Sequence, residues 1–348
     1  MKARANKQTG ATIKDVAERA GVSAMTVSRV LNEATRVRPE TRERVKAAIA
    51  ELNYTPNISA RSLAKARSFF IGLLYSNPNP GYVSELLIGM LNRCRQAGYH
   101  LVIENCGATE EEWARRIESV LDASNFDGII AAPPVGDFAE VRAAVEAAGL
   151  PFVRIAPETG EGSVPYVVTD DYQASVNMTR HLLDLGHERI GFIKGPTDHG
   201  ASGQRERGFR DAMKAANCSV NEDWVVQGRF TYRSALPAAE TLLGCGSRPT
   251  AVFASNDDMA AGVIAVARKY SLEVPDDLSV VGFDDTHTAT TVWPQLTTIR
   301  QPISEMAGAA VDLLSEAFRA EEEPGPVSMI QIPSELIVRG SSARPRSQ

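Results

Sequence analysis

Residues 12–32, TIKDVAERAGVSAMTVSRVLN, predict the fold of the amino-terminal part of the chain. Apolar side chains recur there at the spacing of one helical face, at Ile13, Val16, Ala17 and Ala20. Gly21 then permits a sharp turn, and the hydroxyl of Ser23 can cap a following helix. Two short helices joined by a tight glycine turn are typical of a helix-turn-helix, whose second helix enters the DNA major groove. An ordinary helical hairpin is the alternative.

The next residues extend this unit. Pro39 opens a third expected helix, whose inner stripe is Val45, Ala48, Ile49 and Leu52. Residues 53–68, NYTPNISARSLAKARS, then contain a proline break, Asn57 as a candidate N-cap, and a short helix-competent run. Three helices before residue 53 therefore predict a small closed domain, followed by a linker with a helix of its own.

At this point the chain resembles the LacI/GalR family of bacterial transcription regulators, through DVAERAGVSAMTVSRVLN, ELNYTPN and SARSLA. The resemblance covers nearly the whole chain, apart from about the first ten residues and the tail. It implies an N-terminal all-α helix-turn-helix head plus a hinge helix, and an α/β two-lobed, periplasmic-binding-protein-like body with parallel sheets. The expected boundaries are 11–57 for the head, 58–67 for the hinge helix and linker, 68–340 for the effector-binding and dimerisation domain, and 341–348 for the tail. Lobe 1 is expected at about 69–185 and 302–328, and lobe 2 at about 187–297 and 331–340.

Charge is distributed unevenly along the 348 residues. Residues 1–67 carry fourteen Lys/Arg and six Asp/Glu, a net of +8, whereas the remainder carries 23 basic and 37 acidic residues, a net of −14. A basic head on an acidic body concentrates the attraction for DNA phosphates at one end. The four scattered cysteines show no metal-site spacing, and neither a secretory signal nor a membrane-spanning run is present. We therefore expect a cytoplasmic, nucleoid-associated protein without membrane contact.

From Phe69 onward, short β-branched runs alternate with amphipathic helical stretches, which predicts parallel sheets with ligands at the carboxyl ends of the strands. The resemblance implies that Asp171, Arg205, Asn256 and Asp284 line an effector pocket and that Phe230 packs on a sugar face. Carboxylates and a guanidinium suit a polyhydroxylated ligand. The alternative for each Asp or Asn is a strand-end or helix cap. For Asp257 and Asp285 we favour a cap or a lobe-closing contact over ligand binding. Turn chemistry and ligand contact are equally good explanations of Tyr75, Asn77 and Tyr82.

Signatures of common enzymes are absent, including G-x-S-x-G, Walker A, HExxH and the dinucleotide fingerprint. His187 and His199 lack a paired nucleophile, so we interpret both as structural or solvated. The prediction is a protein that is not an enzyme, with no catalytic residue, no metal and no cofactor.

The head residues divide by their expected contacts with DNA. Lys14, Thr26, Ser28 and Arg29 can contact phosphates or base edges, and Ala24 and Met25 occupy the family positions that distinguish operators. Further DNA contacts are expected from Thr12, Ser23, Asn32, Tyr54, Asn57 and Ala60. Leu63 stands where the family places an apolar wedge in the minor groove, although packing on its own body is the alternative. The operator affinity of a Leu63→Ala protein would separate the two.

These expectations combine into one interpretation of function. We expect a sequence-specific transcriptional regulator, a homodimer on a near-palindromic double-stranded operator, which represses carbohydrate-utilisation genes until a small-molecule effector, a sugar, releases it. A corepressor-dependent, purine-type regulator is the alternative. A free-standing sugar-binding protein is a further one, which the basic head and the missing signal peptide disfavour.

Overall fold

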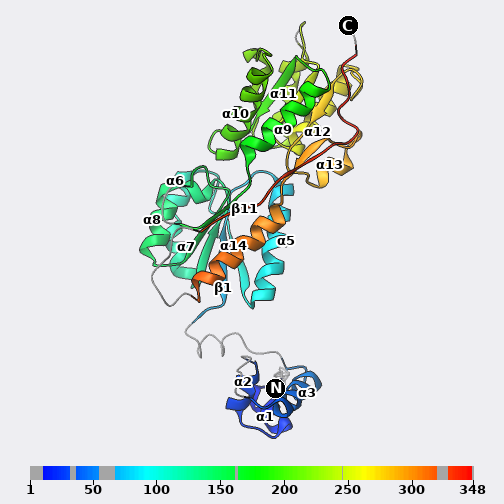
Figure 1. Ribbon diagram of the computed structural model, residues 1–348. Coiled ribbons are helices and arrows are strands. Elements are labelled where there is room, and N and C mark those ends of the chain that lie inside the picture. The colour runs from blue at the N-terminus through cyan, green and yellow to red at the C-terminus, as the bar shows by residue number, and fades with distance from the viewer. Residues whose placement is uncertain are drawn as a thin grey trace, which may run out of the picture. The chain divides into compact units, whose positions relative to one another are not determined.

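A computed structural model describes residues 11–31, 37–54, 67–160, 164–244, 246–319 and 328–346 (Figure 1). The chain divides into two compact units, Met1–Phe69 and Phe70–Gln348. Within the described ranges, no helix combines the length and the apolar character that a membrane span requires.

The amino-terminal unit contains three helices around a small apolar core: α1 Ile13–Ala20, α2 Ala24–Leu31 and α3 Pro39–Glu51. Val16, Val27 and Val45, one from each helix, are fully buried at its centre. These are residues of the stripes that the sequence predicts. The helix-turn-helix interpretation is confirmed at the level of the local fold.

Local hydrogen bonds define both ends of α1. The Thr12 hydroxyl accepts from the Asp15 amide at 3.4 Å, and the Asp15 carboxylate accepts from the Thr12 amide at 2.7 Å, which is a capping box. At the other end Gly21 adopts a left-handed conformation with φ 63°, which favours glycine. The Thr26 amide donates to the Ser23 hydroxyl at 3.2 Å, so Ser23 caps α2 as expected.

Lobe 1 of the larger unit is a parallel sheet of order β11-β5-β4-β3-β1-β2. Its strands are β1 Phe70–Leu74, β2 His100–Glu104, β3 Gly128–Ala131, β4 Phe152–Ile155, β5 Tyr166–Val168 and β11 Met329–Gln331. One face is covered by α5 Pro80–Ala97 and α14 Ile303–Ala317 (Figure 1). The other is covered by α6 Glu110–Ala114, α7 Ile117–Ser124 and α8 Ala139–Ala147, with the turn η1 Val135–Asp137.

Lobe 2 is a parallel sheet of order β7-β6-β8-β9, with strands β6 Ile190–Lys194, β7 Val225–Gln227, β8 Ala251–Ala254 and β9 Ser279–Val281. One face is covered by α9 Asp171–Asp184 and α10 Gly200–Ala215, and the other by α11 Tyr232–Leu243 and α12 Asp257–Lys269. The turn η2 Glu222–Trp224 and the helix α13 His287–Thr291 complete the lobe. A separate antiparallel pair, β10 Thr298–Arg300 and β12 Glu335–Ile337, adjoins it.

The chain passes three times between the lobes, as the sequence predicts, but the first passage lies elsewhere. The expected change of lobe was near residue 186, after α9. In the structure Met178 and Leu182 of α9 pack against Phe192 and Phe209, the core of lobe 2. The first passage therefore follows β5 at about residue 169, because the apolar face of α9 matches the second sheet. The others lie at about 301–302 and 332–334.

The carboxyl end also differs from the expected tail. The described residues 341–346 lie along lobe 2 and are bonded to it. The Val280 amide donates to the Ser341 carbonyl at 2.8 Å, and the Ala343 amide donates to the Ser279 hydroxyl at 3.0 Å. His187 and Ser279 both contact the Ala343 carbonyl, at 2.8 and 3.1 Å. Residues 341–346 are consequently part of lobe 2.

Two glycines at the contact between α5 and α14 offer a test of the packing of lobe 1. A Cβ at Gly89 would lie 2.3 Å from the Ser304 carbonyl oxygen, whereas one at Gly308 would meet only the Arg93 Cβ, at 4.0 Å. We predict that Gly89→Ala lowers the free energy of unfolding by about 1–3 kcal/mol, because the clash is with backbone. Gly308→Ala should be neutral or stabilise by up to about 1 kcal/mol, because alanine favours helix. Urea denaturation of both proteins measures this, and equal stabilities would contradict the packing.

Candidate functional site

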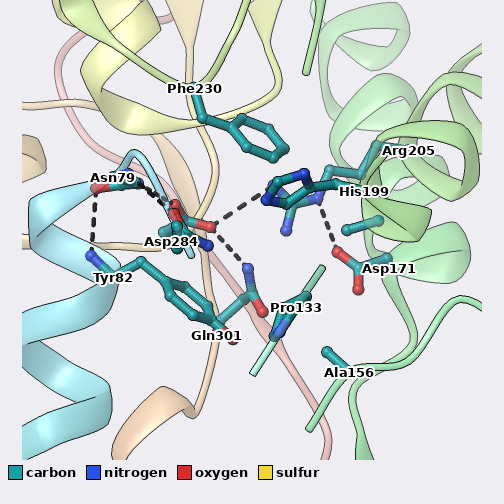
Figure 2. A pocket seen from close by; sticks show the side chains of 12 residues that line it. Asn79, Tyr82, Pro133, Ala156, Asp171, His199, Arg205, Phe230, Asp284 and Gln301 are labelled. Atoms are coloured by element: carbon teal, nitrogen blue, oxygen red, sulfur yellow. Dashed lines mark hydrogen bonds and ion pairs between the residues drawn. The ribbon is translucent and has the colours of Figure 1, made fainter. Parts of the chain in front are cut away.

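A small cavity lies where the two lobes of the larger unit meet, at the carboxyl ends of their strands (Figure 2). Its volume is about 30 Å³, room for about two water molecules. Lobe 1 and lobe 2 both contribute side chains, as does the passage at Gln301. The lining residues are Asn77, Asn79, Tyr82, Pro133, Ala156, Asp171, His199, Ala201, Arg205, Phe230, Asp284 and Gln301.

Arg205, from the first turns of α10, is the central cation of this cavity and is only 4% exposed. Its Nε donates to Asp171 at 2.7 Å and its Nη1 donates to the Ser255 carbonyl at 2.5 Å. The guanidinium carbon lies 3.7 Å from the centre of the Phe283 ring, a cation–π contact. Burial raises the pKa of Asp171, and the opposite charge of Arg205 is the main influence against that rise. Arg205 is therefore held by three partners of lobe 2 and presents one edge to the cavity.

Asp284 connects the two lobes. It follows β9 with a left-handed φ of 106°, an unusual conformation for a residue with a side chain. Its carboxylate accepts from Asn79 Nδ2 of lobe 1 at 3.0 Å and from Gln301 Nε2 at 2.7 Å. Arg205 Nη1 lies 3.6 Å away. Burial raises the pKa of Asp284 to about 7, despite the nearby guanidinium.

The Asn79 amide group shows how the local turn serves the site. Its Oδ1 accepts from the amides of Gly81 and Tyr82, at 3.0 and 3.2 Å, and so caps α5. Its Nδ2 is then directed to Asp284 across the lobe boundary (Figure 2). Asn77 and Tyr82 of this segment were predicted from the sequence, whereas Asn79 was not, because turn chemistry explained the asparagine. Gln301 was also missed, since it lies outside any strand end that the sequence predicts.

His199 is a third residue of the cavity that was not predicted from the sequence as a ligand contact. It was expected to be structural or solvated, but it is 5% exposed and lines the cavity. Its Nδ1 lies 3.1 Å from the Asp198 carboxylate, and its Nε2 has no hydrogen-bond partner among the described residues. Its ring meets Phe230 edge-on, at 5.5 Å and 81°. Its position after a strand could have indicated it, because His199 follows β6 as Asp284 follows β9, and ligands bind at the carboxyl ends of parallel strands.

Two of the predicted effector residues do not line the cavity. Asn256 caps α12, with its Oδ1 accepting from the Met259 amide at 3.0 Å and its Nδ2 donating to the Phe230 carbonyl at 2.9 Å. Both polar atoms are thus used inside lobe 2, and the helix-cap alternative holds for Asn256. Tyr75 packs against the core of lobe 1. The other predicted positions, Asn77, Tyr82, Asp171, Arg205, Phe230 and Asp284, do line it.

Asp257 and Asp285 bind other protein groups and do not line the cavity. Asp257 accepts from Thr298 Oγ1 at 2.6 Å and from the Thr286 amide at 2.8 Å. Its burial, together with nearby Asp284, raises its pKa well above the usual range. Asp285 pairs with Arg300 at 2.8 Å and Arg339 at 2.7 Å, and so ties the β10–β12 pair to the end of β9.

Two larger hollows flank the small cavity at the lobe boundary. One, of about 640 Å³, shares Asn77 and His199 with it and adds polar residues such as Asn105, Asp198 and Arg229. The other, of about 380 Å³, lies beside Ala156, Asp171 and Ala201. A ligand of more than a few atoms can therefore extend from the central cavity into polar space. No group of three or more His, Cys, Asp or Glu side chains in the described ranges is arranged to hold a metal ion.

The outer side of the helix-turn-helix carries both polar and apolar side chains, from α2 and from α1. Met25 is 65% exposed, and Arg29 and Lys14 are also exposed, while Val27 and Val30 face the core. Tyr54 is half-buried against that core. Asn32, Asn57, Ala60 and Leu63 lie outside the described residues.

Comparison with known proteins agrees with both units. The model for bacterial regulatory proteins of the lacI family matches residues 12–57, and that for the periplasmic binding protein-like domain matches residues 179–342. The HTH-type transcriptional repressor PurR of Klebsiella pneumoniae (strain 342) is 35% identical over 336 residues, which are 96% of this chain and 97% of that protein. The chain belongs to the LacI family. The resemblance inferred from the sequence is thereby confirmed.

Solved structures of transcriptional regulators extend the comparison. The transcriptional regulator CelR in complex with cellobiose has a TM-score of 0.72 and 31% identity, covering 95% of this chain and 99% of that one. The Lac repressor dimer bound to operator and the anti-inducer ONPF has a TM-score of 0.77 and 28% identity, covering 96% and 100%. This LacI-family protein is a DNA-binding transcriptional repressor with a helix-turn-helix head and a two-lobed α/β body, as predicted.

The buried carboxyl of Asp284 makes stability depend on pH. Because its pKa rises on folding from 3.8 to about 7, the folded state binds this proton more tightly, and stability is lost as pH rises through about 7. We predict that Asp284→Asn removes this loss, so the variant gains on the wild type between pH 4 and pH 8, by roughly 3–4 kcal/mol at full ionisation. Any cost of the new amide is the same at every pH.

Chemical denaturation at a series of pH values measures this difference. Asp122→Asn, at an exposed position of α7, is the matched control and should follow the wild type. A difference between Asp284→Asn and wild type that stays constant with pH would contradict the raised pKa.

Proposed function

We propose that this repressor is released from its operator when a sugar, a mono- or disaccharide or its phosphate, binds between the lobes of the body. The observation that carries the proposal is the hydrogen-bonded contact of Asp284 with Asn79 and Gln301 at the wall of the cavity. A ligand that takes these partners changes how the lobes are held. The regulated genes would then be those of carbohydrate use, and the protein would act on the chromosome in the cytoplasm.

The side chains at the cavity suit hydroxyl groups. Asp171 and Asp284 accept hydrogen bonds, Arg205 donates them, and the free Nε2 of His199 can do either according to its tautomer. Phe230 is 5% exposed and offers a ring to the apolar face of a pyranose. CelR, which is similar over nearly the whole chain, was solved in complex with cellobiose, and this supports a saccharide as the ligand.

Release would follow from unequal affinity for two lobe arrangements. A ligand shifts an equilibrium only by its difference in affinity between the two states. In this structure Asn79 and Gln301 both donate to the Asp284 carboxylate, and a hydroxyl that replaces either donor would stabilise a different arrangement of the lobes. The coupling is reciprocal, so operator DNA should weaken sugar binding by the same factor.

Purine-dependent corepression is the alternative, and the identity of 35% to PurR repressors favours it. A flat base is held best between parallel walls. His199 and Phe230, which both line the cavity, stand at 81° to each other, so these two rings do not form such walls. The effect of the ligand on operator affinity distinguishes the two cases, because a sugar inducer weakens operator binding and a corepressor strengthens it.

Calorimetry with sugars, sugar phosphates and purines, followed by operator binding with each ligand that binds, tests the proposal. His199→Ala is the site variant, because removal of Arg205 would leave Asp171 and Asp284 buried without their cation. We expect His199→Ala to weaken sugar binding about two- to tenfold, the effect of one hydrogen bond, with unchanged operator affinity. Exposed His287→Ala is the control. A purine that binds tightly and strengthens operator binding would overturn the proposal.

We also propose that the protein acts as a homodimer paired through α5. Members of this family include the dimeric Lac repressor. On α5, the buried residues Leu86 and Met90 face the core, while Ile88 and Leu91 are 51% and 49% exposed on another side. Exposed apolar side chains that follow one helical face favour a protein partner. A second copy would place a second head on a palindromic operator.

The double variant Ile88→Glu, Leu91→Glu should therefore be monomeric by sedimentation and bind operator far more weakly, while sugar binding is retained. Like charges in a two-fold interface repel each other and lose the apolar contact. Ser119→Glu, Ala123→Glu places the same charges on the exposed side of α7 and should remain dimeric. A double α5 variant that remains dimeric would show that the interface lies elsewhere.

A further inference from the structure

Lobe 2 has a second cavity, at the edge of its sheet opposite to the effector site. It is lined by residues that directly precede three parallel strands: Arg189 before β6, Thr250 before β8, and Pro275, Asp276 and Asp277 before β9. Its volume is about 160 Å³. No residue is shared with the cavities at the lobe boundary described above. We call it the distal cavity.

The charges of the distal cavity are unbalanced. Three arginines line it, Arg189, Arg248 and Arg346, against two carboxylates, Asp276 and Asp277. Both carboxylates are bound to one arginine, since Arg346 contacts Asp276 at 2.8 Å and Asp277 at 2.6 Å. The side chains of Arg189 and Arg248 have no hydrogen bond or ion pair with any residue in the described ranges. Two guanidinium groups are thus available, and the lining as a whole is cationic.

The walls of the distal cavity are held in place by bonds that do not involve these two arginines. One wall is the carboxyl-terminal segment, with Pro345 and Arg346. The bonds of Ala343 to His187 and Ser279 anchor it directly beside the cavity. Pro249 and Pro275 form other parts of the lining, and proline rings restrict the backbone. A site whose walls are ordered before binding loses less entropy when a ligand enters.

We propose that the distal cavity binds the phosphate group of a small phosphomonoester. Two guanidinium groups from separate loops, neither of them bonded to a described residue, match a doubly charged tetrahedral anion, because each planar fork can donate two hydrogen bonds to phosphate oxygens. The Thr250 side chain, which already contacts His187 Nδ1 at 2.9 Å, forms part of the polar lining. The volume accommodates one phosphate and a small part of its ester. The carboxyl-terminal segment that the sequence presents as a tail is then a wall of a binding site.

Binding of inorganic phosphate, measured by calorimetry on the full-length protein at low ionic strength, tests this inference. Glucose 6-phosphate and glucose are the further probes, which distinguish a monoester, free phosphate and the sugar alone. Arg189→Gln, Arg248→Gln should weaken phosphate binding at least about tenfold, since charge-assisted hydrogen bonds are lost. Arg233→Gln, Arg268→Gln removes the same charge from exposed helical positions of lobe 2 and should bind as the wild type does.

A variant that should bind phosphate more tightly makes the test stricter. Asp276→Asn removes one negative charge from the lining and frees part of the Arg346 fork, so phosphate should bind several times more tightly. His199→Ala should leave phosphate binding unchanged, because His199 belongs to the other edge of the lobe. Equal phosphate affinity in the Arg189/Arg248 variant and its control, or weaker binding by Asp276→Asn, would overturn the proposal. Glucose 6-phosphate binding that depends on His199 and not on Arg189 would assign the ester to the effector site instead.

Discussion

The buried guanidinium of Arg205 is the charge on which the organisation of the body depends. An ion removed from water costs several kcal/mol unless its partners replace the lost hydration. Asp171, the Ser255 carbonyl and the face of Phe283 are such partners, each from a different segment of lobe 2. One cation therefore brings the amino ends of α9 and α10 together with the carboxyl ends of β8 and β9. The cavity exists because these segments meet there.

Two carboxylates, Asp171 and Asp284, share the single guanidinium of Arg205, and Asp284 also contacts lobe 1. Burial raises the pKa of Asp284 to about 7, and Arg205, which Asp171 and Asp284 share, offsets only part of this rise. Its remaining hydrogen-bonding capacity is taken by Asn79 and Gln301, which belong to lobe 1 and to a passage between the lobes. Polar groups from outside lobe 2 thus complete a site within it. A ligand that changes this balance acts on the contact between the lobes directly.

Much of the fold could be predicted because it depends on local chemistry. Apolar spacing and Gly21 specify the helix-turn-helix, and the alternation of short apolar runs with amphipathic stretches specifies two parallel sheets. Parallel strands bring their carboxyl ends to one edge, so candidate ligand residues could be sought there, and the resemblance to the family then singled out Asp171, Arg205 and Asp284 among them. The basic head and acidic body likewise separate DNA binding from ligand binding, and they need no knowledge of tertiary contacts.

Tertiary structure decided between alternatives that the local sequence patterns do not distinguish. The spacing of the apolar residues in α9 does not indicate which sheet the helix covers. Its packing on Phe192 and Phe209 assigns it to lobe 2. Asn256 and Asn79 both stand at helix starts. The side-chain amide of Asn256 donates to Phe230 within lobe 2, whereas that of Asn79 donates to Asp284 across the lobe boundary. Residues 341–346 read as a polar tail, yet bonds to β9 make them a wall of lobe 2. Sequence by itself determined which groups can ionise and which segments form helices and strands, because these follow from side-chain type and spacing. Only the folded chain decided which polar atoms find partners, because that depends on distances between segments far apart in the sequence.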